Sequence, residues 1–440
     1  MRPRSRCPIL EFLPTAGTKV LAILTVLSAL VSAGMANAQF NQYTPPGGPL
    51  ERPITREERL KLEIEAARYH LGPIRLAPEM GIKDVAYVRN LFNGGEGSVP
   101  PDVTATVNAG FRSYLHTGPK VVWVGRFLPE YVWWQRRRDS RNLNLSYGVE
   151  GLGFFNRLFL GVAAERNEHQ EILTPEVPEL ASSHADLLQA TAEVRWNAVY
   201  SSFVTLSENR QKGLVDDLAD PRLREIALLD RTDQVLRGGM RWRPRKGFTL
   251  GLGAERSQVD FDRRERDSSN FGTAPVLELV VDRHKLFFQA DIAARSLKAQ
   301  TGSRFIPFSG VTGNVGLSIK PRRTLEVWTY GSRSLVYSLS PSAPYFEDTR
   351  VGLSVVVSTG RRLVSRLYAE AGTNDYIAFS PVAPERRDTV RSFGGSMRFL
   401  VSERVMLSAQ VTRSRFESNV PGNGRSFTSG GLSLRFGGLL

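Results

Sequence analysis

Residues 311–328 have the sequence VTGNVGLSIKPRRTLEVW, and this stretch decides the fold. Apolar or small residues occupy the odd positions from 311 to 319, and mostly polar residues occupy the even positions. The sequence PRR at 321–323 interrupts the alternation, which resumes with Leu325 and Val327 on the apolar side. Because successive side chains of a strand point to opposite faces, the stretch predicts a β-hairpin with one apolar and one polar face.

The same alternation repeats along most of the chain and predicts eighteen strands. We place them at residues 82–92, 102–115, 120–134, 142–154, 157–167, 186–197, 199–208, 232–243, 247–260, 272–282, 285–297, 309–320, 323–337, 346–358, 361–376, 388–400, 403–416 and 425–437. Short and long connections alternate between these strands, as in outer-membrane barrels with short periplasmic turns and longer external loops. The fold class that we predict is all-β, a transmembrane antiparallel up-and-down β-barrel of about 18 strands. Sixteen strands is the alternative, because single-chain barrels of this type have even strand numbers.

The N-terminal 38 residues have the features of a cleaved signal peptide. Basic residues precede an apolar segment at 20–33, and the small residues around Ala38 form a cleavage site. Residues 39–81 are predicted to form a periplasmic leader, followed by the barrel at 82–440. Within the leader, Thr55 and Glu58 form a capping box, and Gly72-Pro73 marks the predicted end of a short charged helix. Three roles stay open for this helix: a plug, a periplasmic docking element, or a segment lying against the barrel rim.

Composition narrows the classes of function. The only cysteine, Cys7, lies in the signal segment, which excludes disulfides and thiolate metal sites from the mature chain. No apolar run of the length that a membrane helix needs follows residue 38. The net charge of +14 favours an anionic partner such as anionic lipid or an acidic polymer. Nucleic acid is not expected as a partner, because the signal segment predicts export. The predicted location is the outer membrane of a Gram-negative bacterium.

In a lipid environment the apolar face of each strand points outward and the polar face lines a wet interior. A soluble β-sandwich with the same alternation is the weaker alternative. The charged residues predicted to line the lumen are Arg112, Arg126, Glu130, Glu150, Glu165, Glu193, Arg195, Arg237, Arg241, Glu255, Glu278, Asp291, Arg295, Glu326, Arg366, Glu370, Arg398 and Arg435. The two signs are nearly balanced. The residues therefore either pair with one another and hold the wall, or form a hydrated, weakly selective pore.

The sequence offers no catalytic or metal-binding pattern. The histidines are expected in the leader, in turns or in loops, with none on a lumen-facing strand position beside a serine or aspartate. No phosphate-binding glycine loop, HExxH motif or metal-ligand cluster occurs. We predict no enzyme activity and no cofactor, with a lumenal hydrolase as a remote alternative.

Two adjacent segments carry a resemblance to a known family. Residues 71–78 (LGPIRLAP) lead into 82–87 (IKDVAY) and 90–92 (NLF). This resembles the start of the outer-membrane β-barrel porin family associated with exopolysaccharide and capsule export, in which a GPxRLxP stretch leads into the first strand. The resemblance implies a large barrel that helps a polysaccharide cross the outer membrane. It also supports residues 82–92 as a true first strand.

The predicted function is therefore a porin-like conduit that assists polysaccharide export. A sealed structural or receptor barrel and a general diffusion porin are the alternatives. The expected partners are outer-membrane lipid and lipopolysaccharide, a polysaccharide, and periplasmic export components.

Overall fold

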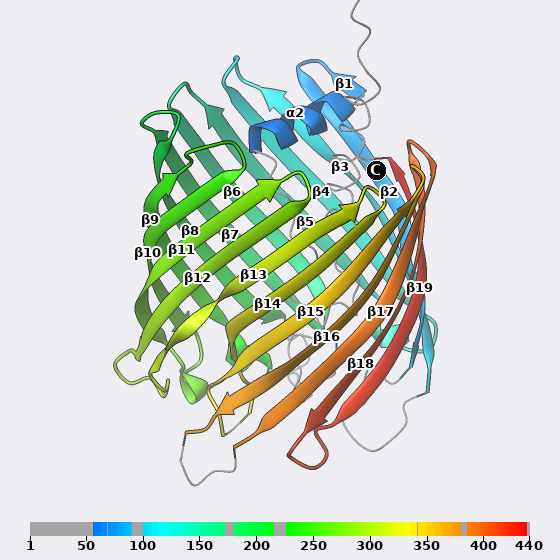
Figure 1. The fold of residues 1–440 in the computed structure, drawn as a ribbon. Coiled ribbons are helices and arrows are strands. Elements are labelled where there is room, and N and C mark those ends of the chain that lie inside the picture. The colour runs from blue at the N-terminus through cyan, green and yellow to red at the C-terminus, as the bar shows by residue number, and fades with distance from the viewer. Residues whose placement is uncertain are drawn as a thin grey trace, which may run out of the picture.

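The computed structural model describes residues 56–67, 69–89, 100–171, 180–214, 226–340, 342–379 and 385–437. The signal segment and residues 39–55 lie outside the described residues. The chain forms one closed antiparallel β-barrel (Figure 1). The wall strands are β2 (Ile74–Arg89), β3 (Asp102–His116), β4 (Val121–Trp134), β5 (Asn142–Phe154), β6 (Leu158–Glu171), β7 (Ala181–Arg195), β8 (Tyr200–Leu214), β9 (Arg231–Trp242), β10 (Phe248–Phe261), β11 (Asn270–Arg283), β12 (Leu286–Ala299), β13 (Phe308–Arg322), β14 (Leu325–Tyr337), β15 (Tyr345–Thr359), β16 (Leu363–Ile377), β17 (Arg387–Ser402), β18 (Val405–Ser418) and β19 (Arg425–Gly437).

Each wall strand pairs with its sequence neighbours, and β19 closes the barrel by pairing with β2 from Thr428–Arg89 to Gly437–Glu79. The prediction of an eighteen-strand barrel is confirmed, and the sixteen-strand alternative is wrong. In the described residues, no helix has the length and apolar character that would be needed to cross a bilayer.

The first wall strand begins earlier than the sequence predicted. Strand β2 starts at Ile74 rather than at residue 82, so residues 74–81 belong to the wall and not to the leader. Their alternation is weak because Pro78 and Glu79 interrupt it. Pro78 pairs with Phe111 of β3 but lies just beyond the last residue that pairs with β19. Its missing N–H is therefore tolerated at this partly unpaired edge.

Strands β6, β7 and β8 also extend beyond their predicted limits on the side of the long loops. The added residues are mainly polar, so a search for apolar alternation misses them. They nevertheless continue the ladder, as in the pairs Glu168–His184 and Asp186–Arg210. Backbone pairing continues here without an apolar face because these strand ends leave the hydrocarbon region.

The leader contains a helix and a small hairpin. Helix α2 (Arg56–Ala66) ends before the predicted stop. Gly72-Pro73 is instead the turn between β1 (Tyr69–Leu71) and β2, with Gly72 at a φ of 59°. Glycine adopts this left-handed conformation without the steric cost of a Cβ. The predicted cap residue Thr55 lies outside the described residues.

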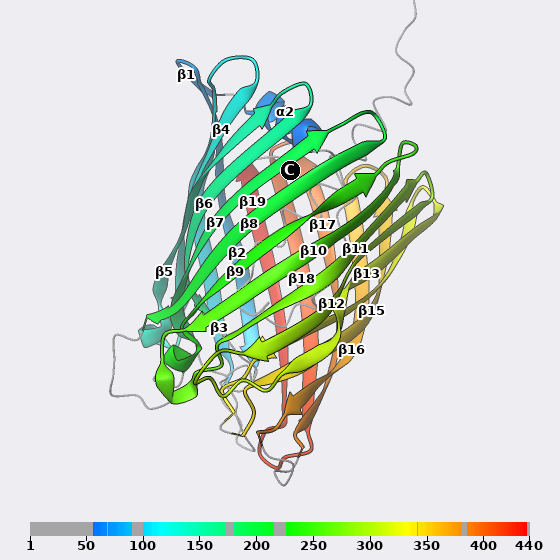
Figure 2. The same cartoon turned by 90° about the vertical axis from the view of Figure 1, so that its left-hand side faces the viewer.

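The two ends of the barrel differ (Figures 1 and 2). Helix α2, strand β1 and the end of β19 share one end, where tight turns connect the strands. Tight turns mark the periplasmic side of such a barrel. The turn between β13 and β14 also lies on this side, and Pro321 falls where their register shifts. A proline without an N–H fits such a break in the ladder.

The outer face is apolar. Leucine, valine and aromatic side chains point outward along the strands, including Leu367, which is 68% exposed, and Val351, which is 61% exposed. A surface of this kind is stable in hydrocarbon and unfavourable in water, so the fold is that of a transmembrane β-barrel.

Candidate functional site: the charged inner wall

The inner face of the barrel carries charged side chains at alternate positions. On β9, Arg237 and Arg241 alternate with Leu236 and Met240, which are exposed on the outside. On β12, Asp291 contacts Arg237 and therefore also lies on the inner face. Strand geometry thus places these charges inside, because the side-chain period is two.

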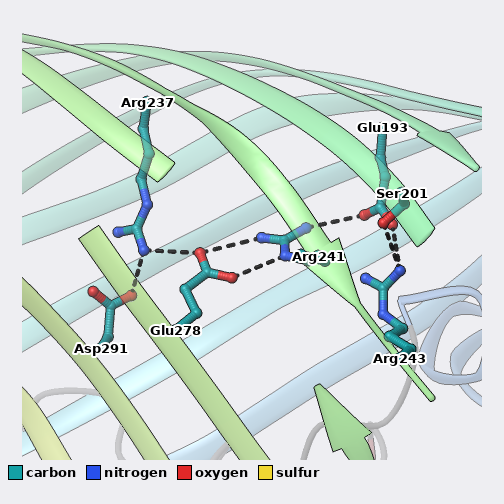
Figure 3. Close-up of polar contacts among 7 residues, drawn as sticks. All are labelled: Glu193, Ser201, Arg237, Arg241, Arg243, Glu278 and Asp291. Carbon is teal, nitrogen blue, oxygen red and sulfur yellow. Dashed lines mark hydrogen bonds and ion pairs between the residues drawn. The ribbon is translucent and has the colours of Figure 1, made fainter. Parts of the chain in front are cut away.

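The densest group lies on strands β7 to β12 (Figure 3). Glu278 of β11 accepts hydrogen bonds from Arg237 at 2.8 Å and from Arg241 at 2.8 Å. Arg237 also donates to Asp291 of β12 at 2.8 Å. Arg241 reaches Glu193 of β7 at 3.0 Å, and the other carboxylate oxygen of Glu193 accepts from Arg243 at 2.9 Å. We call these six residues the β7–β12 network.

The β7–β12 network is electrically balanced, with three guanidinium groups and three carboxylates. Five of its members come from the four strands β7, β9, β11 and β12, and Arg243 directly follows β9, so the ion pairs connect a wide arc of the wall. The Arg241 guanidinium also stacks on the ring of Phe203, 3.8 Å from its centroid. Arginine suits this position because its planar fork can bind carboxylates and stack on an aromatic ring at once.

Several other predicted residues form separate pairs. Glu255 binds Arg295 at 2.8 Å, and Arg126 approaches Glu165 at 3.8 Å. Further pairs have one partner that the sequence did not predict: Glu130–Lys83 at 2.6 Å, Arg435–Glu79 at 2.7 Å, Glu326–Lys320 at 3.1 Å and Arg112–Glu63 at 3.4 Å. Glu63 and Glu79 were missed because both lie in the segment assigned to the leader. The pair Arg435–Glu79 joins β19 to β2 across the closing seam.

A more polar group occupies strands β14 to β16. Arg366 donates to the hydroxyl of Ser354 at 2.8 Å and lies over the ring of Tyr368. Glu370 accepts a hydrogen bond from the hydroxyl of Tyr330 at 3.0 Å. These carboxylate and guanidinium groups are therefore held by hydroxyl groups and an aromatic ring from strands β14, β15 and β16.

The structure places the remaining three predicted residues on separate strands. Glu150 lies on β5, with Val124 and Ala163 as its backbone partners. Arg398 lies on β17, opposite Ser408. Arg195 ends β7 at the periplasmic side and is exposed. None of these three belongs to the β7–β12 network (Figure 3).

Helix α2 lies against the inner wall at the periplasmic mouth. Leu60, Ile64 and Ala67 pack on a buried group formed by Tyr114, Val122 and Leu152 of β3, β4 and β5. These wall residues point inward, since Trp123 and Leu115 occupy the alternate positions. Tyr114 is 1% exposed and donates its hydroxyl hydrogen to Glu63 at 3.2 Å. The narrow apolar stripe of the helix therefore covers the wall from inside the mouth.

The β14–β15 hairpin narrows the opposite mouth. Its connecting residue Leu339 packs on Ala181 of β7 and on Ile226, seven strands away in the barrel order. Tyr337 at the end of β14 accepts a hydrogen bond from Asn270 of β11 at 2.8 Å, and Arg231 of β9 lies over its ring. Contacts with such distant strands require the hairpin tip to cross the lumen.

One sequence-based prediction about the histidines is wrong. His169 does not lie in a loop: β6 continues to Glu171 and places His169 on the inner face. Its Nε2 atom lies 3.1 Å from the hydroxyl oxygen of Ser146 on β5. His184 likewise lies on β7, facing outward. Both were missed because the outer ends of these strands lack apolar alternation.

The Ser146–His169 contact alone does not define a catalytic site, because nucleophilic catalysis also needs an oriented base and an oxyanion-binding group. In the described part of the chain, no group of three or more histidine, cysteine, aspartate or glutamate residues is arranged to hold a metal ion. The expectation that the chain is not an enzyme stays a prediction.

Comparisons with known proteins agree with the architecture. A scan against protein-family models finds no match, and a search of curated proteins finds no similar sequence. Among solved structures, OccAB3 of Acinetobacter baumannii is 9% identical, with a TM-score of 0.50, and covers 82% of this chain and 98% of its own. OccK2 (OpdF) of Pseudomonas aeruginosa is 11% identical, with a TM-score of 0.51, and covers 82% of this chain and 97% of its own. At these identities the comparison shows the fold.

The fold defines the class of protein and its location. The chain is an eighteen-stranded β-barrel with the architecture of outer-membrane porins. With its apolar outer face and closed wall, it lies in the outer membrane of a Gram-negative bacterium.

Proposed function

We propose that the barrel is a porin-like passive conduit and that its solute is a polysaccharide leaving the cell. The observation that carries the proposal is the pairing of charges on the inner wall, as in the β7–β12 network. Paired charges keep a wall hydrated but leave little net field to trap a solute. A conduit needs this combination, because a solute that binds tightly leaves slowly.

The choice of a polysaccharide rests on the resemblance of the stretch at 71–92 to barrels of exopolysaccharide and capsule export. In the structure residues 71–89 of this stretch form the end of β1, the Gly72-Pro73 turn and β2, which closes the barrel with β19, and residues 90–92 lie outside the described residues. OccK2, a barrel of similar architecture, has been solved in complex with glucuronate, which is a sugar acid. Sugar acids are therefore suitable small probes for this lumen.

Reconstitution of the purified full-length chain in planar bilayers tests the conduit. We expect stepwise conductance that neutral and acidic oligosaccharides reduce reversibly when added from the periplasmic side. In cells, deletion of the gene should lower surface polysaccharide and raise its periplasmic pool. The absence of conductance steps in either polarity would contradict the open conduit, and an unchanged surface polymer would contradict the export role.

A sealed structural or receptor barrel is the second candidate, because α2 and the β14–β15 hairpin occupy the two mouths. A general diffusion porin is the third. It would pass small sugars and amino acids in vesicle-swelling assays at rates set by size alone, without block by an oligosaccharide.

The β14–β15 hairpin gives a direct prediction for the conduit. Leu339→Asp places a charge in the apolar contact with Ala181 and Ile226, and an unpaired charge there is unfavourable. We expect the hairpin tip to leave the far wall and the single-channel conductance to increase. Val351→Ala, on the outer face of the same hairpin, is the matched control and should leave conductance unchanged. If Leu339→Asp conducts like the unmodified protein, the hairpin does not limit the pore.

A further inference from the structure

A group of arginines lies on the outer face of the barrel, near the ends of strands β17 and β18 that lead to the long loops. Arg391 of β17 and Arg415 of β18 are direct backbone partners. Arg413 lies two residues from Arg415 and therefore on the same face. All three are exposed, and they alternate with the inward residues Ser392 and Ser414. We call Arg391, Arg413 and Arg415 the arginine triad.

The arginine triad has fewer carboxylate partners than guanidinium groups. Like charges directly opposite each other on neighbouring strands are destabilising, and Arg391 and Arg415 occupy such a position. Arg415 has an ion pair with Glu417 at 2.7 Å. Within the described residues, no carboxylate lies within ion-pair distance of Arg391 or Arg413. The triad therefore combines three guanidinium groups with one carboxylate.

Other charges on the outer face show a different arrangement. Arg333 of β14 is paired with Glu347 of β15, and Arg166 of β6 binds Asp186 of β7 through two nitrogens. There, a neighbouring strand supplies the counter-charge. At the arginine triad the neighbouring strands supply serine and threonine instead, since Arg415 faces Ser426 and Arg413 faces Thr428.

The arginine triad lies at the edge of the apolar band. Moving toward the periplasm, the next outward residues are Phe393 on β17 and Val411 on β18, which are 56% and 54% exposed. Moving the other way, the strands enter the long external loops. The triad thus lies where the hydrocarbon of the outer leaflet meets its headgroups. Arg89 of β2, which shares Thr428 as a backbone neighbour with Arg413, extends the basic surface across the barrel seam.

We propose that the arginine triad binds the phosphate groups of a phosphorylated glycolipid of the outer leaflet, lipopolysaccharide. A guanidinium group binds a phosphate through two parallel hydrogen bonds, and several arginines can share one dianionic group. Phosphate between Arg391 and Arg415 relieves their mutual repulsion. The acyl chains of the same lipid lie along Phe393 and Val411. This surface is independent of the proposed transport path, which runs on the other face of the wall.

The test is binding of lipid by the full-length protein in detergent, measured by native mass spectrometry and by titration. The probes are diphosphorylated lipid A, the same lipid after enzymatic removal of its phosphates, and phosphatidylglycerol. We expect preference for diphosphorylated lipid A and a loss of affinity of roughly tenfold or more in the double variant Arg391→Gln, Arg413→Gln. The double variant Arg391→Lys, Arg413→Lys should recover part of the affinity, because it keeps charge without the fork.

Arg333→Gln is the matched control, since it removes one outward charge whose carboxylate partner lies on the next strand. It should leave lipid A binding within the error of the assay. Retained heat-modifiable mobility on gels shows that each variant is still a folded barrel. Equal binding of the phosphorylated and dephosphorylated lipids, or equal losses in the control and the double variant, would overturn the proposal. A preference for phosphatidylglycerol would overturn the assignment to lipopolysaccharide.

Discussion

Leu317→Arg should destabilise the assembled barrel by about 2–4 kcal/mol. Leu317 lies on the outer face of β13 between Val315 and Ile319, both of which are exposed. A guanidinium group at this depth loses its hydration and meets hydrocarbon, where no carboxylate can compensate it. We expect a lower yield of folded barrel in lipid vesicles and a lower urea midpoint, measured by the heat-modifiable shift on gels.

Asn314→Arg is the matched control on the same strand. Asn314 faces inward, is exposed, and lies opposite Asp291 of β12. An added arginine there meets water and a carboxylate, so we expect little loss of stability. Equal losses for the two variants would show that the inward and outward faces of β13 are assigned wrongly. Unchanged stability of the Leu317→Arg barrel would likewise show that Leu317 does not face the lipid.

Glu278→Gln should have the largest effect on the lining itself. Glu278 is shared by Arg237 and Arg241, and its side chain is only 17% exposed. Removing its charge leaves two guanidinium groups with one fewer carboxylate between them. Loss of one partner from a mostly buried, charge-assisted contact costs about 1–3 kcal/mol. We expect a lower unfolding midpoint of the barrel in urea.

The same variant should change ion selectivity if the lumen conducts. The β7–β12 network is balanced in the unmodified protein and carries one excess positive charge in Glu278→Gln. We expect the reversal potential in a salt gradient to shift in the direction that indicates a higher permeability for anions than for cations. Glu347→Gln removes an equal charge from the outer face and should leave selectivity unchanged. An identical shift in both variants would mean that total charge, and not the lining, sets the selectivity.

A double-mutant cycle within the β7–β12 network measures the contribution of one ion pair. The double variant Arg241→Gln, Glu278→Gln removes both charges of one pair. If they interact as the 2.8 Å contact indicates, its loss of stability should be smaller than the sum of the two single losses. Simple additivity would show that the contact contributes nothing to the stability of the wall.

Sequence patterning was sufficient to predict the wall strands because each strand has its own alternation of apolar and polar residues. In residues 311–328 the two alternating runs correspond to β13 and β14, whereas the turn lies at Arg323-Thr324, because β13 continues through Pro321 to Arg322. The charged residues on β9 and β11 follow from the same period of two. Their partners do not follow from it, because cross-strand register decides which carboxylate reaches Arg237 or Arg241.

The alternation of apolar and polar residues did not predict the strand ends that extend out of the lipid. At the outer ends of β6 and β7, polar residues occupy both faces, so His169 was placed in a loop and its contact with Ser146 could not be predicted as a strand contact. At the other end, Ile74 to Gly81 looked like leader sequence because proline and glutamate interrupt its pattern. Contact with lipid requires every second side chain of a strand to be apolar. Strand ends outside the bilayer have no such requirement, so the alternation by which strands are predicted is missing there.

The sequence by itself determined the class of fold, an up-and-down β-barrel, and its apolar outer face, since these depend on local periodicity, but it left eighteen and sixteen strands open. Only the tertiary structure decided how the mouths are filled. Helix α2 packs inside on Tyr114, and Leu339 reaches the far wall at Ala181. It also decided that Arg391 and Arg415 become neighbours. These contacts join residues far apart in the chain, and they depend on barrel closure and strand register, which no local pattern contains.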